Sequence, residues 1–94
     1  MKKEFPLKGE NITESKERLI LELYRLRKKA KISQVLLAEI AKMPQVSISR
    51  IESLTIDTTL KNLVKYAEAL GFEVSLVLKS KDENKEVEKT FKKQ

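Results

Sequence analysis

The feature that most restricts the fold of this chain is a pair of short helical patterns that meet at a proline. Apolar residues recur at helical spacing over residues 34–42 and again over residues 44–53, with Met43-Pro44 between the two segments. Proline suits the first turn of a helix and disfavours helical conformation in the residue before it. We therefore expect two short helices, joined by a tight turn, whose apolar faces pack against each other. The facing residues are Leu37, Ala38, Ile48 and Ile51.

Two further helices flank this pair. Asn11, followed by Glu14, resembles a capping box and predicts a helix over about 12–30, whose buried face would carry Leu19, Leu23, Leu26 and Ala30. Ser33 is a suitable N-cap for the second helix, which would also bury Ala41. A fourth helix should begin near Thr59 and stop at Gly71. Its expected buried residues are Leu60, Leu63, Val64, Ala67 and Leu70.

After Gly71 the apolar period changes from 3.6 to 2, which predicts a half-buried strand over residues 72–80. No second strand pattern is present to pair with it, so we expect pairing with another chain, a twofold mate or a partner protein. The alternative is an extended tail that lies across the helices. The inward residues of the strand would be Phe72, Val74, Leu76 and Leu78.

These patterns predict an all-α bundle of four to five helices with a single C-terminal β-strand. Residues 1–11 read as a flexible arm, residues 12–71 as the helical domain and residues 72–80 as the pairing strand. Residues 81–94 read as a charged, disordered tail. A chain of 94 residues forms one domain.

Composition excludes several classes of function. The chain has no Cys and no His, so thiol catalysis, disulfides and imidazole-based metal sites or triads are excluded. None of the 14 Asp and Glu falls in a recognisable acid–base or metal-ligand spacing. We expect no enzyme activity, no cofactor and no metal. Without a signal segment or an apolar run of membrane-spanning length, we expect a cytoplasmic protein with no membrane partner.

The positive charge of the chain is concentrated in its middle. Residues 11–54 carry nine Lys and Arg against five Asp and Glu, and five of the nine lie between Arg25 and Lys31. Such a region favours a polyanionic partner. The alternative is a solvated helix end, because cations favour the last turn of a helix.

The second helix of the pair should expose side chains that suit the edges of DNA bases. Gln pairs with adenine, Arg with guanine, and an apolar group contacts the methyl of thymine. The outward residues would be Gln45, Val46, Ser49 and Arg50. Gln34 begins the preceding helix, where backbone N–H groups attract phosphate.

In its order and spacing, this pattern resembles the XRE, or phage-repressor-like, helix-turn-helix family over residues 19–71. Within that family, the stretch from Thr59 to Gly71 followed by a short apolar strand is similar to HigA-type antitoxins. That resemblance implies a protein that represses its own operon and neutralises a RelE-like (HigB-type) mRNA-cleaving toxin. The residues that carry the broader pattern are Leu26, Arg27, Ser33, Gln34, Leu37, Ala38, Gln45, Ile48, Ser49, Arg50, Ile51 and Glu52.

The resemblance also implies roles for individual residues. It places the phosphate-contacting glutamine at Gln34 and an ion pair between Arg27 and Glu52, and its base-reading positions coincide with the four outward residues above. Lys42 stands where the family has its turn glycine, which predicts either a wider turn or a left-handed Lys42, and we include Lys42 in the DNA-facing set. Pro44 replaces the usual Ser or Thr cap. Leu54 and Thr58 replace the common Gly and Pro.

Four apolar residues fall on helix faces that should point outward. Two aligned pairs on neighbouring helices suggest a contiguous patch for a protein partner. The alternative is that the arm or the tail folds over them. The four residues are Ile20, Tyr24, Leu36 and Ile40.

Three functions follow from these expectations. The first is an antitoxin that acts as a homodimer on double-stranded operator DNA and forms a heterotetramer with its toxin. The second is a stand-alone XRE-type repressor without a toxin partner. The third is an adaptor whose strand and basic face serve protein assembly alone.

Overall fold

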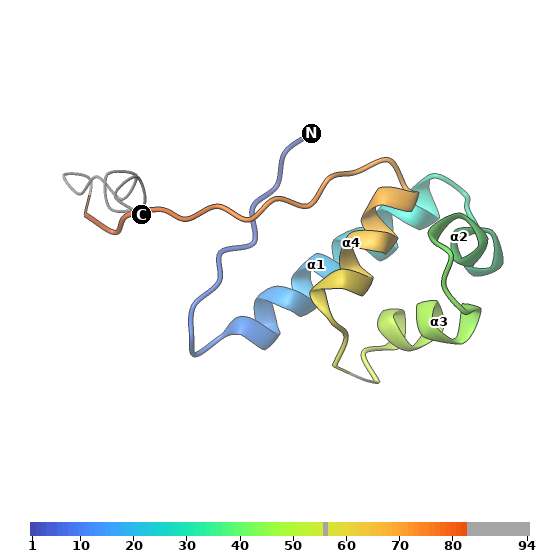
Figure 1. The fold of residues 1–94 in the computed structure, drawn as a ribbon, viewed down its shortest axis with the longest axis horizontal. Helices are drawn as coiled ribbons and strands as arrows, with labels where there is room; N and C mark the ends of the chain where they lie inside the picture. Colours follow the sequence, from blue (N-terminus) through green and yellow to red (C-terminus); the bar gives the residue numbers. More distant parts are fainter. Residues whose placement is uncertain (56, 83–94) are drawn as a thin grey trace, which may run out of the picture.

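A computed structural model of the chain describes residues 1–55 and 57–82 and contains four helices (Figure 1). These are α1 (Ile12–Lys29), α2 (Gln34–Ala41), α3 (Gln45–Ser53) and α4 (Leu60–Ala69). Helix α2 packs against both α3 and α4, and α1 packs against the same two helices. Four of the predicted four to five helices are therefore present in the described residues, with bounds close to those expected. None of the helices in the described part combines the length and apolar character needed to cross a bilayer.

The N-cap predicted at Ser33 is present, and Thr59 also caps the helix that begins after it. Ser33 Oγ accepts the backbone N–H of Leu36 at 3.0 Å, and Thr59 Oγ1 accepts that of Asn62 at 3.1 Å. Asn11 does not cap α1 with its side chain, because its Oδ1 accepts the backbone N–H of Lys8 at 3.1 Å. The predicted capping box is therefore wrong: the asparagine closes the turn that precedes the helix.

Within residues 1–55 and 57–82, three residues other than glycine adopt the left-handed conformation. Lys42 (φ 57°) ends α2 and Leu54 (φ 59°) ends α3, while Lys31 (φ 59°) follows α1. Of the two outcomes expected for Lys42, the structure has the left-handed one. A side chain in this region costs about 1–2 kcal/mol. Gly71 (φ 87°) follows α4 without that cost, as its position predicted.

The core lies where the four helices meet. The predicted residues of α2 and α3 are buried, and Leu37, Ile48 and Ile51 are completely so. Helix α4 adds Leu63 and Ala67, and also Tyr66, which the apolar pattern did not include. Leu60 was expected inside but is exposed, whereas Val64 and Leu70 are half-buried.

The buried face of α1 differs from the predicted leucine stripe. Leu23 is buried as expected, but Leu19 and Leu26 are only half-buried and Ala30 is exposed. The other buried positions are Ser15, Ile20 and Arg27. The predicted leucine stripe differs from the buried face because polar Ser15 and charged Arg27 belong to that face. Ile20 is only 3% exposed, so assigning it to a protein-partner surface is wrong.

Residues 72–80 form an extended segment and not a strand. Phe72 and Val74 pack against the core, and the segment then leaves the bundle (Figure 1). Its next residues, Leu76, Val77 and Leu78, are 73%, 64% and 68% exposed. A single segment has no ladder partner within one chain, which explains why the predicted β-strand is not formed here. From residue 83 onward, the predicted charged tail lies outside the described residues.

The N-terminal arm, residues 1–11, has no helix and lies along α1. Ser15 Oγ donates to the carbonyl of Pro6 at 2.6 Å, and Lys3 forms an ion pair with Glu22 at 3.0 Å. Near its start the arm crosses the extended segment, where Glu4 and Lys79 form an exposed ion pair at 2.7 Å (Figure 1). Polar contacts thus join the arm to α1 and to the extended segment.

Candidate nucleic-acid interface

Helix α3 has an inner face and an outer face with different chemistry. Ile48 and Ile51 point into the core and are completely buried. The outer face carries four exposed side chains with a carboxamide, an isopropyl group, a hydroxyl and a guanidinium. These are Gln45, Val46, Ser49 and Arg50. The helix is thereby anchored on one side while it offers donors, acceptors and an apolar group on the other.

The loop before α3 leaves its N-terminus open. Pro44 occupies the N-cap position and provides no side-chain hydrogen bond to the first turn. The turn itself is tight, because the backbone N–H of Met43 donates to the carbonyl of Ala38 at 3.0 Å. Lys42 is exposed in this turn, two residues before the N-cap of α3.

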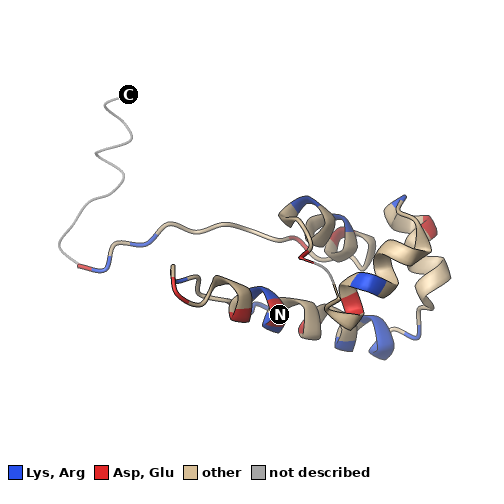
Figure 2. Ribbon diagram, turned by 90° about the horizontal axis from the view of Figure 1, so that it is seen from below, with Lys and Arg blue, Asp and Glu red and all other residues tan. Residues whose placement is uncertain are grey.

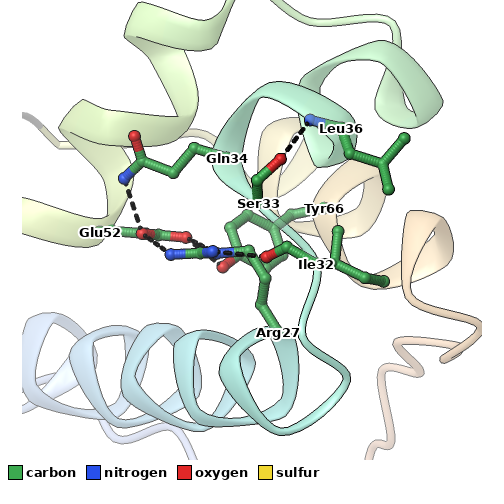
Figure 3. A network of polar contacts seen from close by, with 7 residues as sticks. All are labelled: Arg27, Ile32, Ser33, Gln34, Leu36, Glu52 and Tyr66. Atoms are coloured by element: carbon green, nitrogen blue, oxygen red, sulfur yellow. Dashed lines mark hydrogen bonds and ion pairs between the residues drawn. The ribbon is translucent and has the colours of Figure 1, made fainter.

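A buried ion pair fixes the other end of α3. Arg27 of α1 binds Glu52 with two parallel hydrogen bonds, Nε to Oε2 at 2.6 Å and Nη2 to Oε1 at 2.8 Å (Figure 3). The two side chains are only 7% and 5% exposed. The third contact of the guanidinium is from Nη1 to the carbonyl of Ile32 at 2.6 Å, so it also holds the loop between α1 and α2. The sequence resemblance placed an ion pair at these two residues.

Two more residues complete the network around Glu52. Gln34 Nε2 donates to Glu52 Oε1 at 3.0 Å, and the hydroxyl of Tyr66 donates to Glu52 Oε2 at 2.5 Å (Figure 3). Residues from α1, α2 and α4 therefore converge on one carboxylate of α3. Sequence reasoning did not include Tyr66. Tyr66 follows Leu63 at helical spacing, so its ring could have been placed in the core, and a buried tyrosine hydroxyl usually has a hydrogen-bond partner.

The network keeps Glu52 ionised. Burial by itself would raise the pKa of Glu52, but hydrogen bonds from Arg27, Tyr66 and Gln34 bring that pKa below its ordinary value. The hydrogen bonds that Arg27 donates to Glu52 raise the pKa of Arg27 above its ordinary value. Burial, followed by the hydrogen bond to Glu52, raises the pKa of the Tyr66 phenol. At neutral pH, Glu52 is thus a carboxylate that only accepts hydrogen bonds.

Residues 23–77 match the helix-turn-helix family HTH_3. The chain belongs to this family. The match covers more than half of the chain and includes the whole of α2, α3 and α4. No curated protein and no solved structure matches the chain.

Membership in this helix-turn-helix family defines the class of the protein. It is an XRE-type, DNA-binding regulator of transcription, and the family is generally not enzymatic. In the described residues, no group of three or more carboxylates is placed to hold a metal ion. Within the helix-turn-helix, α2 and α3 are the paired helices, and the outer face of α3 is open to solvent.

Positive charge lies beside this surface. Lys and Arg residues are concentrated at the carboxyl end of α1 and in the loop that leads to α2 (Figure 2). Lys28, Lys29 and Lys31 are all exposed there. Gln34 begins α2 immediately after this loop and is half-buried. The helix-turn-helix thus places a cationic edge next to the residue expected to contact phosphate.

The apolar patch expected on the outer helix faces is present only in part. Tyr24, Leu36 and Ile40 are 40%, 44% and 48% exposed, whereas Ile20 belongs to the core. Val35, the neighbour of Leu36 on α2, is also exposed. The ring of Tyr24 lies 5.5 Å from the guanidinium carbon of Arg27, so one face of that ring is already in contact. The other exposed members of this patch, Leu36 and Ile40, lie on α2.

Proposed function

We propose that this chain is a transcriptional repressor that binds operator DNA as a dimer, with α3 in the major groove. The observation that supports this proposal is the two-sided character of α3. Its outer carboxamide and guanidinium groups suit adenine and guanine, and Val46, at 53% exposed, suits the thymine methyl. A twofold dimer would place two such helices about 34 Å apart, in successive major grooves of a near-palindromic site.

Contacts to the DNA backbone would supply much of the affinity. In the proposed complex, Gln34 and Lys42 approach phosphates on either side of α3, and the cationic end of α1 lies over the neighbouring backbone. Neutralising phosphates with Lys and Arg releases counterions, so the affinity should fall steeply as salt concentration rises. Binding to specific and to non-specific DNA should both depend on salt, because both involve phosphates. Only binding to the specific site uses contacts to base edges.

The proposal is tested by removing the base-reading side chains. A duplex that the wild-type chain selects from a random library serves as the probe, and Gln45→Ala combined with Arg50→Ala is the variant. We expect specific binding to fall by about 100-fold or more while weak non-specific binding survives. Lys61→Ala, which removes an exposed cation of α4, is the control and should bind the duplex like the wild type. Specific binding that survives the double substitution would contradict the assignment of α3.

The dimer would form through residues 72–80, paired antiparallel with the same segment of a second copy. The segment is extended, and Leu76, Val77 and Leu78 are exposed in the single chain. Leu76→Pro removes a backbone donor and should give monomers or aggregates in light scattering. Leu76→Ala, which retains the donor, is the control. A proline variant that still forms a clean dimer would contradict pairing through this segment.

We further propose that the chain neutralises a RelE-like (HigB-type) toxin and forms a heterotetramer with it, as HigA-type antitoxins do. The exposed apolar residues on α2 and beyond α4 support this proposal, because they lie outside the outer face of α3. Co-expression with the product of an adjacent gene, followed by mass measurement, tests the complex. Leu36→Gln with Ile40→Gln should weaken it and leave DNA binding unchanged. If the adjacent product does not bind while DNA binding is retained, the chain is a stand-alone repressor.

A further inference from the structure

We propose that Glu52 is a positioning residue of the DNA interface. Held by Arg27 and Tyr66, its carboxylate fixes the side-chain amide of Gln34 so that one N–H is free to donate to a backbone phosphate. This inference rests on the proposed DNA binding and concerns residues behind the surface that meets the duplex. Glu52 and Tyr66 would not touch DNA themselves.

The carboxylate of Glu52 has a hydrogen-bond donor at each of its lone-pair sites. A carboxylate offers about four lone-pair sites, and Glu52 receives four hydrogen bonds in the structure. Two come from Arg27, one from Gln34 and one from Tyr66. Because each oxygen accepts two donors, the carboxylate cannot rotate without losing several contacts at once. It therefore presents a fixed acceptor to Gln34.

The contact with Glu52 fixes the orientation of the Gln34 side-chain amide. A carboxylate accepts but cannot donate, so Gln34 has to turn its NH₂ group, and not its carbonyl, toward Glu52 (Figure 3). The NH₂ group has a second hydrogen, which this contact leaves available. Phosphate oxygens also only accept, so an amide that presented its carbonyl would repel them. The contact with Glu52 selects the productive orientation before DNA arrives, which reduces the ordering cost of binding.

The Tyr66 hydroxyl helps to hold the Glu52 carboxylate in place. Tyr66 is completely buried on α4, and its ring packs in the core. Its hydroxyl donates to Oε2, the oxygen that Gln34 does not use. Phenylalanine would preserve the packing and remove only this donor. The hydroxyl therefore acts on Gln34 through the position of the carboxylate.

A double-mutant cycle on DNA affinity tests the coupling, with the duplex selected by the wild-type chain as the probe. Gln34→Ala should weaken binding about tenfold in the wild-type background, the loss expected for a hydrogen bond to a charged group. In the Glu52→Gln and Tyr66→Phe backgrounds, the same substitution should weaken binding about threefold or less. If Glu52 and Tyr66 only stabilised the fold, their substitution would lower DNA affinity, but Gln34→Ala would still weaken binding about tenfold in both backgrounds.

Phosphate substitution gives an independent readout. Replacing single phosphates of the duplex by neutral methylphosphonates should reveal one position at which the wild type loses affinity and Gln34→Ala does not. If Glu52→Gln does not fold, Tyr66→Phe alone decides, since it retains the Arg27–Glu52 pair. Equal effects of Gln34→Ala in every background overturn this inference. Failure of the wild type to select any duplex overturns the proposed function instead.

Discussion

Among the ion pairs that join segments distant in sequence, Arg27–Glu52 and Glu4–Lys79 have the most different surroundings. Arg27–Glu52 connects α1 with α3 inside the bundle, where both side chains are nearly inaccessible to water. Glu4–Lys79 connects the N-terminal arm with the extended segment, and both of its side chains are about half-exposed or more. The first pair has further partners in Tyr66 and Gln34.

This comparison shows how burial, more than the type of residue, sets what a charge pair does. In water, an exposed pair gains little because solvent and salt screen it. In the interior, each partner depends on the other, because an unpaired buried charge is strongly unfavourable. The bundle therefore holds one arrangement of its helices, whereas the arm and the extended segment can separate at little cost.

The largest expected effect comes from breaking the buried pair. Arg27→Met leaves the Glu52 carboxylate buried without its main partner, so we expect a loss of about 3–5 kcal/mol in the free energy of unfolding. Lys79→Met is the matched change in the exposed pair and should leave the denaturation midpoint unchanged. Chemical denaturation followed by circular dichroism measures both. Similar losses in the two variants would contradict the contrast between the pairs.

A somewhat smaller effect is expected from an apolar substitution in each region. Ile51→Ala opens a cavity among completely buried side chains and should lower stability by about 3 kcal/mol. Leu78→Ala removes a side chain that is 68% exposed in the single chain, and should not alter the unfolding of the bundle. Thermal unfolding of both variants at low concentration provides the measurement. A large loss from Leu78→Ala would show that the extended segment belongs to the folded core.

The pH dependence of stability should also separate the two pairs. The pKa of Glu52 lies below its unfolded value, so its contribution is present above about pH 4.5 and is lost as the pH falls through the folded-state pKa. The wild type should therefore unfold more readily in denaturant at pH 3 than at pH 6. Glu52→Gln should show a smaller change, whereas Glu4→Gln should behave like the wild type because Lys79 and Glu4 are exposed. An unchanged acid response in Glu52→Gln would contradict this assignment.

The smallest expected effect is a gain in stability. Leu54 ends α3 in the left-handed conformation, which glycine adopts without strain. Leu54→Gly should therefore stabilise the bundle by up to about 1 kcal/mol, with part of the relief offset by the greater freedom of glycine in the unfolded chain. Gly9→Ala, in the arm, is the comparison and should have no measurable effect. Differential scanning calorimetry can resolve a shift of this size.

Much of the helical bundle could be predicted from the sequence, because it depends on local patterns. The apolar periods of α2 and α3, the proline between them and the caps at Ser33 and Thr59 are signals within a few residues of one another. The order of Gln34, Arg27 and Glu52 also carried the family resemblance. Exposure of the outer face of α3 followed once Ile48 and Ile51 had been assigned to the core.

The errors have physical causes of a different kind. The buried face of α1 was misjudged because Arg27 occupies a core position, and a charged residue is counted as outward in an apolar pattern. This shifted the stripe and placed Ile20 outside. The contact of Tyr66 with Glu52 depends on the packing of two helices and has no local signature. A strand over residues 72–80 would need pairing partners from a second chain, and the pattern in one chain carries no information about them.

The position of the extended segment has a consequence for how proteins of this design can diversify. The segment leaves the bundle on the side opposite α3 (Figure 1). If Gln45 and Arg50 read bases and the extended segment joins two copies, as we propose, substitutions at Gln45 or Arg50 would change the recognised nucleotide sequence without altering the assembly surface, and the reverse would also hold. After gene duplication, two copies could acquire separate targets while they still associate, or keep one target while they stop associating.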